Sequence, residues 1–126
     1  MRPEPNSGRV RLLPAMKAKD VYVGELEQQI LLIVLRLGDD AYANPIGEML
    51  TVAARRRVGR GALYTALERL EAKGCLRSTM GEPLPERGGR ARRYFTVTAA
   101  GMRALRESRR VLLGLWDGLE SKLETS

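Results

Sequence analysis

Three helix-like segments followed by two strand-like segments constrain the fold of this 126-residue chain more than any other feature. Apolar side chains recur at the spacing of one helix face over residues 24–37, 45–53 and 60–73. Two runs rich in β-branched and aromatic residues, 75–80 and 92–97, then flank a Pro- and Gly-rich stretch, which predicts a hairpin with a long tip. This order predicts a mainly α, α+β fold in which one small hairpin follows three helices.

Local residue preferences set the expected ends of the helices. Gly74 follows the third apolar stripe and predicts a helix end there. Asn44 is expected to cap the second helix, with Pro45 at its first position. Thr98 is expected to cap a single last helix that runs from about residue 99 to residue 123. The first helix carries further leucines outside its main stripe, so it is expected to be buried on more than one side: Leu31, Leu32 and Leu35.

Positive charge is concentrated in two short segments. The chain has a formal net charge of +7, which favours a polyanionic partner such as nucleic acid. Residues 55–69 and residues 87–93 each carry a net charge of +4, so the remainder of the chain is close to neutral. Such clustering predicts a defined binding patch rather than a generally basic surface.

The third predicted helix has the composition of a helix that reads a DNA major groove. Gly61, Thr65 and Glu68 are expected on the face opposite its apolar stripe. Small, polar and basic side chains on that face suit contact with base edges, and the arginines and glycines of the hairpin suit contact with the DNA backbone or minor groove. The predicted DNA contacts are Arg57, Arg60, Gly61, Tyr64, Thr65, Arg69, Arg87, Gly88, Gly89, Arg90, Arg92 and Arg93.

Two helices, a turn, a third helix and a basic hairpin together form the pattern of a winged helix-turn-helix. The sequence also resembles the PadR family of bacterial transcriptional regulators over about residues 22–120. Residues 61–74 are close to the recognition helix of that family, with a Leu-Tyr pair near its start, and residues 88–101 are similar to its wing and to the entry of its last helix. Residues 43–45 depart from the pattern, because Ala, Asn and Pro stand where the family usually has Gly and an acid.

The resemblance implies a homodimer that binds a pseudo-palindromic DNA operator, usually as a repressor. A single helix after residue 98 is similar to the shorter branch of the family, in which that helix dimerises. The expected organisation is a basic N-terminal arm at residues 1–20, a winged helix-turn-helix at 21–98 and a C-terminal dimerisation helix at 99–126. The side chains expected in the dimer interface are Leu105, Leu112, Trp116, Leu119 and Leu123. Some relatives bind flat apolar ligands at the dimer centre, so Trp116 is also a candidate for binding a small apolar effector.

The residue types that catalysis uses are scarce. The chain has no His and one cysteine, Cys75, and it lacks a phosphate-binding Gly-rich loop, so we expect no enzyme activity, no metal site and no cofactor. Cys75 is expected to be a buried structural thiol in a reducing cytoplasm. The longest apolar run, residues 30–35, is too short to span a membrane, and residues 1–20 lack the apolar core of a signal peptide. The expected location is therefore the bacterial cytoplasm, with no membrane partner.

A winged-helix module that binds protein or RNA within a larger assembly is the alternative function. Its basic hairpin would then face an acidic protein or an RNA stem. The presence of arginines on both the third helix and the hairpin favours contact with DNA at two neighbouring places. A stable monomer without affinity for duplex DNA would favour the alternative.

Overall fold

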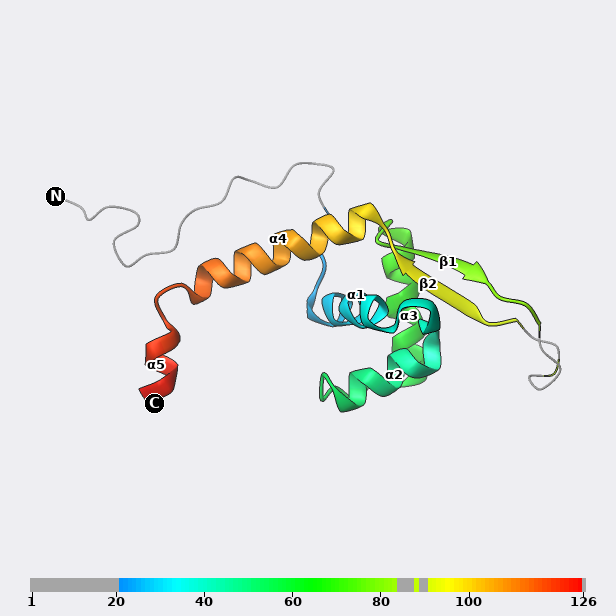
Figure 1. Cartoon of the computed structure of the whole chain (residues 1–126), viewed down its shortest axis with the longest axis horizontal. Helices are drawn as coiled ribbons and strands as arrows, with labels where there is room; N and C mark the ends of the chain where they lie inside the picture. The colour runs from blue at the N-terminus through cyan, green and yellow to red at the C-terminus, as the bar shows by residue number, and fades with distance from the viewer. Residues whose placement is uncertain (1–20, 84–87, 89–90, 126) are drawn as a thin grey trace.

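The computed structural model describes residues 21–83, 88 and 91–125, and its elements follow the predicted order (Figure 1). The helices are α1 (Glu25–Leu37), α2 (Ala43–Val52), α3 (Arg60–Ala72), α4 (Ala99–Trp116) and α5 (Glu120–Thr125), with a short 3-10 turn at Gly38–Asp40. The strands β1 (Leu76–Met80) and β2 (Arg93–Val97) form an antiparallel hairpin. The three-helix body carries this hairpin on one side and α4 on the other (Figure 1). The predicted winged helix-turn-helix architecture is confirmed.

α1 lies at the centre of the body and contacts α2, α3 and β2. Its N-terminus is held by Glu27, whose Oε1 accepts a hydrogen bond from Gly24 N at 2.9 Å. Ile30, Leu31 and Val34 are almost completely buried in the core. The expectation of burial on more than one side is wrong for two of the three extra leucines, because these lie on the face that the body leaves open: Leu32 and Leu35 are 49% and 45% exposed.

α2 begins earlier than its sequence suggests. Its N-cap is Tyr42 rather than Asn44, so Pro45 lies third in the helix. The expected capping by Asn44 is therefore wrong, and Tyr42 has no side-chain cap hydrogen bond. The chain leaves α2 through Arg55, whose backbone is left-handed with a φ of 54°, and then enters α3 at its N-cap Gly59.

The hairpin is anchored to the body by its inner residues. Leu76 pairs with Val97, Ser78 with Phe95 and Met80 with Arg93. The Phe95 side chain is buried in the core, and Phe95 N donates a hydrogen bond to Ala41 O at 2.8 Å. The segment between α1 and α2 therefore lies directly against β2.

α4 starts as predicted but ends early. Thr98 Oγ1 accepts a hydrogen bond from Gly101 N at 3.0 Å, which confirms Thr98 as the cap. Gly101 is required by packing, since a Cβ there would collide with the carbonyl oxygen of Cys75 and lie 2.8 Å from Val97 Cγ1. The prediction of one continuous last helix is wrong, because α4 ends at Trp116 and Gly118, with a φ of 81°, separates it from α5.

The described chain has two structurally different parts. The winged body is the described chain up to residue 105, and the C-terminal extension is residues 106–125. Leu105, expected in a dimer interface, packs partly buried against the core of its own chain. None of the helices within the described ranges is long and apolar enough to cross a membrane.

Candidate nucleic-acid interface

α3 presents one apolar and one polar face, as predicted. Its buried side chains are Leu63, Ala66, Leu67 and Leu70. Gly61, Thr65 and Arg69 are exposed on the other side, and a Cβ at Gly61 would meet nothing within 4 Å. Packing therefore does not require glycine at position 61, and the start of α3 is open to the close approach of a ligand.

An ion-pair cluster joins the hairpin to the second half of α3. The Arg93 guanidinium pairs with the Glu71 carboxylate, and Arg93 Nε donates to Ser78 Oγ at 3.1 Å. Ser78 Oγ in turn donates to Glu71 Oε2 at 2.7 Å. The three side chains come from β2, β1 and α3, so the cluster helps to set the angle of the hairpin relative to α3. Arg93, predicted to contact DNA, thus has an intramolecular role that its sequence context did not indicate.

Arg92, the neighbouring residue, is held differently. Its guanidinium carbon lies 4.1 Å from the centroid of the Tyr42 ring, a cation–π contact. The Tyr42 ring meets the Tyr94 ring nearly edge-on, with centroids 5.6 Å apart and planes at 69°. Tyr42 therefore connects the start of α2 to the base of the hairpin.

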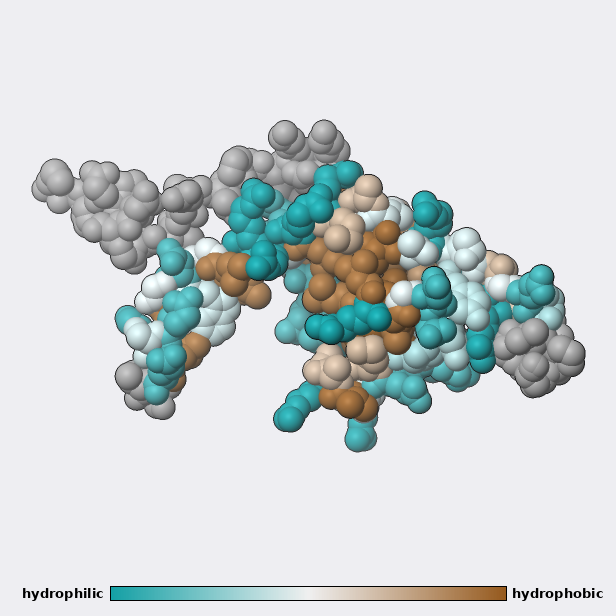
Figure 2. All heavy atoms as spheres, viewed as in Figure 1, coloured by the Kyte–Doolittle hydropathy of each residue, from teal (hydrophilic) through white to brown (hydrophobic). Residues whose placement is uncertain are grey.

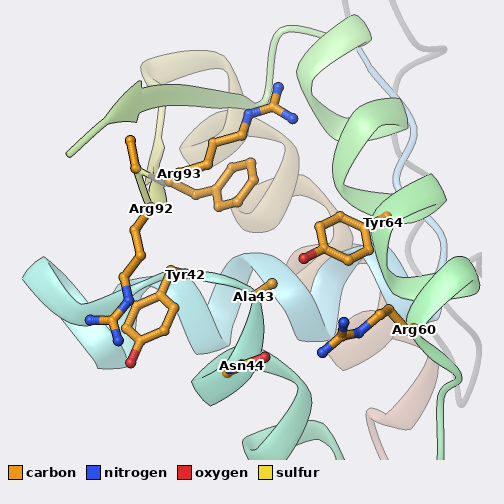
Figure 3. Close-up of a pocket in the computed structure, with 9 residues that line it drawn as sticks. Tyr42, Ala43, Asn44, Arg60, Tyr64, Arg92 and Arg93 are labelled. Atoms are coloured by element: carbon orange, nitrogen blue, oxygen red, sulfur yellow. The ribbon is translucent and has the colours of Figure 1, made fainter. Parts of the chain in front are cut away.

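A hollow of about 340 Å³ lies between α2, α3 and the base of the hairpin. Its lining residues are Tyr42, Ala43, Asn44, Arg60, Tyr64, Ala91, Arg92, Arg93 and Phe95. Figure 3 shows Arg60 and Tyr64 on the α3 side, with the Tyr64 hydroxyl pointing inward, and Arg92 on the opposite side with its guanidinium beside the Tyr42 ring. None of the described lining residues is an acid, so the hollow is chemically suited to an anion.

The two arginine clusters of the sequence meet at this hollow. Arg60 belongs to the first cluster, and Arg92 and Arg93 belong to the second. Arg57 is exposed in the turn before α3, and Gly88 is exposed with a φ of 65°. The remaining predicted contacts lie outside the described residues: Arg87, Gly89 and Arg90.

The titratable groups with shifted pKa values lie away from the hollow. Burial raises the pKa of the Glu27 carboxyl, but hydrogen bonds from Lys73 and Gly24 outweigh this, so the net effect is a lowered pKa. Lys73 Nζ lies 2.7 Å from Glu27 Oε1 and also donates to Tyr22 O at 2.8 Å. Cys75 is completely buried, as predicted, and burial raises the pKa of its thiol. Within the described ranges, no group of three or more His, Cys, Asp or Glu residues could hold a metal ion.

Comparison with known protein families matches residues 31–107 to the Transcriptional regulator PadR-like family. The match covers more than half of the chain and includes α2, α3 and both strands of the hairpin. The chain belongs to the PadR-like family. The resemblance noted from the sequence is therefore confirmed, and the hollow described above lies within the matched region.

Individual relatives agree with this assignment. The PadR-like chain is 48% identical over 56 residues to the transcriptional regulator Rv3488 of Mycobacterium tuberculosis, covering 44% of this chain and 49% of that protein. The aligned part is thus about half the length of that relative. A PadR family transcription regulator from Clostridium difficile has a TM-score of 0.61 at 22% identity, covering 79% of this chain and 99% of that chain. A PadR family regulator from Eggerthella lenta has a TM-score of 0.58 at 28% identity, covering 80% of this chain and 89% of that chain.

Sequence reasoning missed the residues of this PadR-like chain that hold the predicted contacts in place. Tyr42 stacks on Arg92, and Glu71 and Ser78 hold Arg93. Each of these pairs joins segments distant in sequence, so no local pattern marks it. One sequence feature could have indicated the role of Glu71: it is an acidic residue on a helix that is followed by a strongly basic hairpin.

Proposed function

We propose that this PadR-like protein binds double-stranded DNA sequence-specifically as a homodimer and represses transcription from a pseudo-palindromic operator in the bacterial cytoplasm. The observation that carries the proposal is the convergence of the two arginine clusters, since Arg60 and Arg92 line one hollow beside the exposed face of α3. A surface built from a helix face and an adjacent basic hairpin matches the shape of a DNA groove and its flanking backbone.

The exposed face of α3 supplies the side chains for reading bases. Thr65 can donate or accept a hydrogen bond and can contact a thymine methyl group through its own methyl. Arg69 lies one turn further along the same exposed surface, and Gly61 removes side-chain bulk one turn before Thr65. Arg57, in the turn that precedes α3, is placed for a backbone phosphate. We assign sequence discrimination to Thr65 and Arg69 and general affinity to the arginines of the turn and hairpin.

The C-terminal extension supports the homodimer. Its exposed large apolar residues are Val111, Leu112, Leu113, Leu115, Trp116, Leu119 and Leu123. Figure 2 shows hydrophobic surface at the end of α4 and again over α1, where Leu32 and Leu35 are exposed. Exposed apolar surface of this extent is typical of an interaction site. A twofold pair built on it would present two copies of α3 to successive half-sites about 34 Å apart on DNA.

Trp116 is the single tryptophan of the chain and is 38% exposed among these leucines. In the proposed dimer two such rings would lie near the twofold axis, and a flat apolar effector would bind between them. The fluorescence of Trp116 reports directly on that site. Quenching by one member of a panel of planar apolar compounds is the expected result, and an unchanged spectrum across the panel would contradict effector binding at Trp116.

Selection of bound fragments from genomic DNA tests the proposed function. The wild-type protein is expected to enrich a sequence with twofold symmetry, and its affinity should fall steeply with salt because phosphate contacts release counterions. Thr65→Val is expected to change the selected sequence, whereas Arg92→Gln should weaken all duplexes about equally. Equal binding to every duplex would overturn sequence-specific regulation. A stable monomer without duplex affinity would instead favour a module that binds protein or RNA.

A further inference from the structure

The hollow between α2, α3 and the hairpin has the features of a site for one anionic group. Arg60 lines it from the first turn of α3, and Arg92 lines it from the base of the hairpin on the opposite side (Figure 3). The Tyr64 hydroxyl adds a hydrogen-bond donor that points inward from α3. The guanidinium group forms paired hydrogen bonds with phosphate oxygens, so two arginines on opposite sides of a hollow suit a phosphate.

Two helix N-termini reinforce this preference. Ala43 and Asn44, the first two residues of α2, and Arg60, the first residue of α3, all line the hollow. Neither helix has a side-chain cap at its N-terminus. The first hydrogen bonds of the two helices run from Ile46 N to Tyr42 O at 3.2 Å and from Leu63 N to Gly59 O at 2.9 Å. The backbone N–H groups that precede these donors therefore have no acceptor within the helix. The partial positive charges at the N-termini of α2 and α3 therefore add to the positive charges of the arginines.

The hairpin arginine is positioned before any ligand arrives. The Tyr42 ring holds the Arg92 guanidinium at 4.1 Å, and the bond from Phe95 N to Ala41 O fixes the Tyr42 segment against β2. Arg93, by contrast, is directed to Glu71 on α3. Both arginines line the hollow, but they are held differently: Arg93 is paired with Glu71 on α3, whereas Arg92 is stacked on Tyr42. An arginine already held in place loses less side-chain entropy on binding.

We propose that this hollow seats one phosphate group, bound by Arg60 and Arg92, and that Tyr42 is a positioning residue for Arg92. The proposal rests on the DNA-binding function above and assigns the phosphate to the DNA backbone, once in each half-site. It makes Arg60 a backbone contact, although its place at the start of α3 suggested a role in reading bases. Sequence discrimination then comes from residues further along α3, such as Thr65.

Neutralising single phosphates of the selected operator tests the site. Each backbone phosphate is replaced in turn by an uncharged methylphosphonate, and affinities are measured for the wild type and for Arg60→Gln, Arg92→Gln and Arg103→Gln. At one phosphate in each half-site the wild type is expected to lose about ten- to hundredfold in affinity. Arg60→Gln and Arg92→Gln should each lose clearly less than the wild type from that replacement, because one of the two arginine contacts is already absent. Arg103→Gln, an equal change of charge at an exposed position of α4, should keep the full loss.

Tyr42 variants test the positioning role separately. Tyr42→Ala should lower operator affinity about two- to fivefold, as expected for a cation–π contact at a partly exposed site. Tyr42→Phe should retain wild-type affinity, because the ring face remains. In the double variant Tyr42→Ala, Arg92→Gln, the tyrosine change should add nothing. Equal losses for Tyr42→Phe and Tyr42→Ala, or additive losses in the double variant, would contradict this role.

The possible outcomes separate the proposal from the function on which it rests. Operator binding without any phosphate that couples to Arg60 and Arg92 overturns the phosphate site and leaves the regulator function intact. Failure of the wild type to prefer any sequence overturns the function itself. Inorganic phosphate is the probe for a free ligand, and its displacement of operator is compared with that by chloride at equal ionic strength. Stronger displacement by phosphate in the wild type but not in Arg92→Gln, without any backbone phosphate that couples to the two arginines, would mean that the hollow binds free phosphate. The assignment to the DNA backbone would then be wrong.

Discussion

The winged body and the C-terminal extension use apolar residues in opposite ways. In the body the apolar side chains of α1, α2, α3 and the hairpin close into one core, in which Ile46 and Leu50 are completely buried. In the extension every large apolar residue of the described chain is at least 38% exposed. The body has the core of a stable domain, whereas the extension has an exposed apolar surface typical of an interaction site.

The two parts also differ in how their polar groups are used. The body contains ion pairs between distant segments, including Arg56 with Glu25, Lys73 with Glu27 and Arg93 with Glu71. In the extension, the pair that the structure shows joins Arg110 to Glu107 within one helix turn. Long-range pairs fix the relative positions of elements, and a local pair does not. The comparison indicates that contacts within the single chain define the shape of the body, and the proposed dimer would define the position of the extension.

Truncation of a core side chain should have the largest effect and should not depend on assembly. Leu67→Ala is expected to lower the free energy of unfolding by about 2–5 kcal/mol, because Leu67 is 1% exposed and its loss leaves a cavity. Denaturant unfolding at low and high protein concentration measures the change. The difference from wild type should be the same at both concentrations. A difference that grows with concentration would mean that the core of the body forms only in the dimer.

The partly buried pair of Glu27 and Lys73 should give the next largest effect and a dependence on pH. Glu27→Gln is expected to cost about 1.5–3 kcal/mol at neutral pH, the range for hydrogen bonds to charged groups. Because the folded-state pKa of Glu27 is lowered, the stabilisation is present above the ordinary glutamate pKa of about 4.3 and is lost as the pH falls through the lowered value. Unfolding measured from pH 7 to pH 3 should show the two proteins converging at the acid end. A constant difference across that range would contradict the assignment.

A substitution in the extension should act through assembly instead. Leu112→Ala is expected to weaken the proposed dimer by about 1–2 kcal/mol, roughly five- to thirtyfold in dissociation constant, and to leave the unfolding of the dilute monomer nearly unchanged. Sedimentation equilibrium measures the dissociation constant. Arg109→Ala, an exposed charged residue on the same helix, is the matched control and should leave assembly as in the wild type. Equal effects of the two substitutions would exclude the leucine face as the interface.

The sequence predicted elements wherever a local signal decides the structure. Helical spacing located α1 and α3, Gly74 with its φ of 80° ends α3 as expected, and Thr98 caps α4. The start of α2 was missed because tertiary contacts decide it. Ala41 O accepts a hydrogen bond from Phe95 N in β2, and the Tyr42 ring stacks on Arg92. These contacts outweigh the local capping preference of Asn44.

The end of α4 and the details of the hollow could not be predicted from local sequence patterns, for different reasons. The spacing of Leu112, Trp116, Leu119 and Leu123 suits one continuous helix. Two glycines, Gly114 and Gly118, lie within this stripe, and each by itself is only a weak stop signal. Charge clustering located Arg60 and Arg92 correctly at one surface. It could not show that the adjacent Arg93 turns to Glu71, because that choice depends on how the hairpin packs on α3.

The smallest expected effect, at Gly61, separates stability from binding within the body itself. Gly61 lies in the first turn of α3 with open space around its missing side chain, so Gly61→Ala should raise the free energy of unfolding by about 0.5–1 kcal/mol through helix propensity. The same methyl group would stand on the face proposed to approach the DNA bases, so operator affinity should fall. Thermal unfolding and operator titration of the one variant measure both changes. A protein that becomes more stable and binds DNA as well as the wild type would show that α3 does not approach the bases at this position, and would move the contact surface toward Thr65 and Arg69.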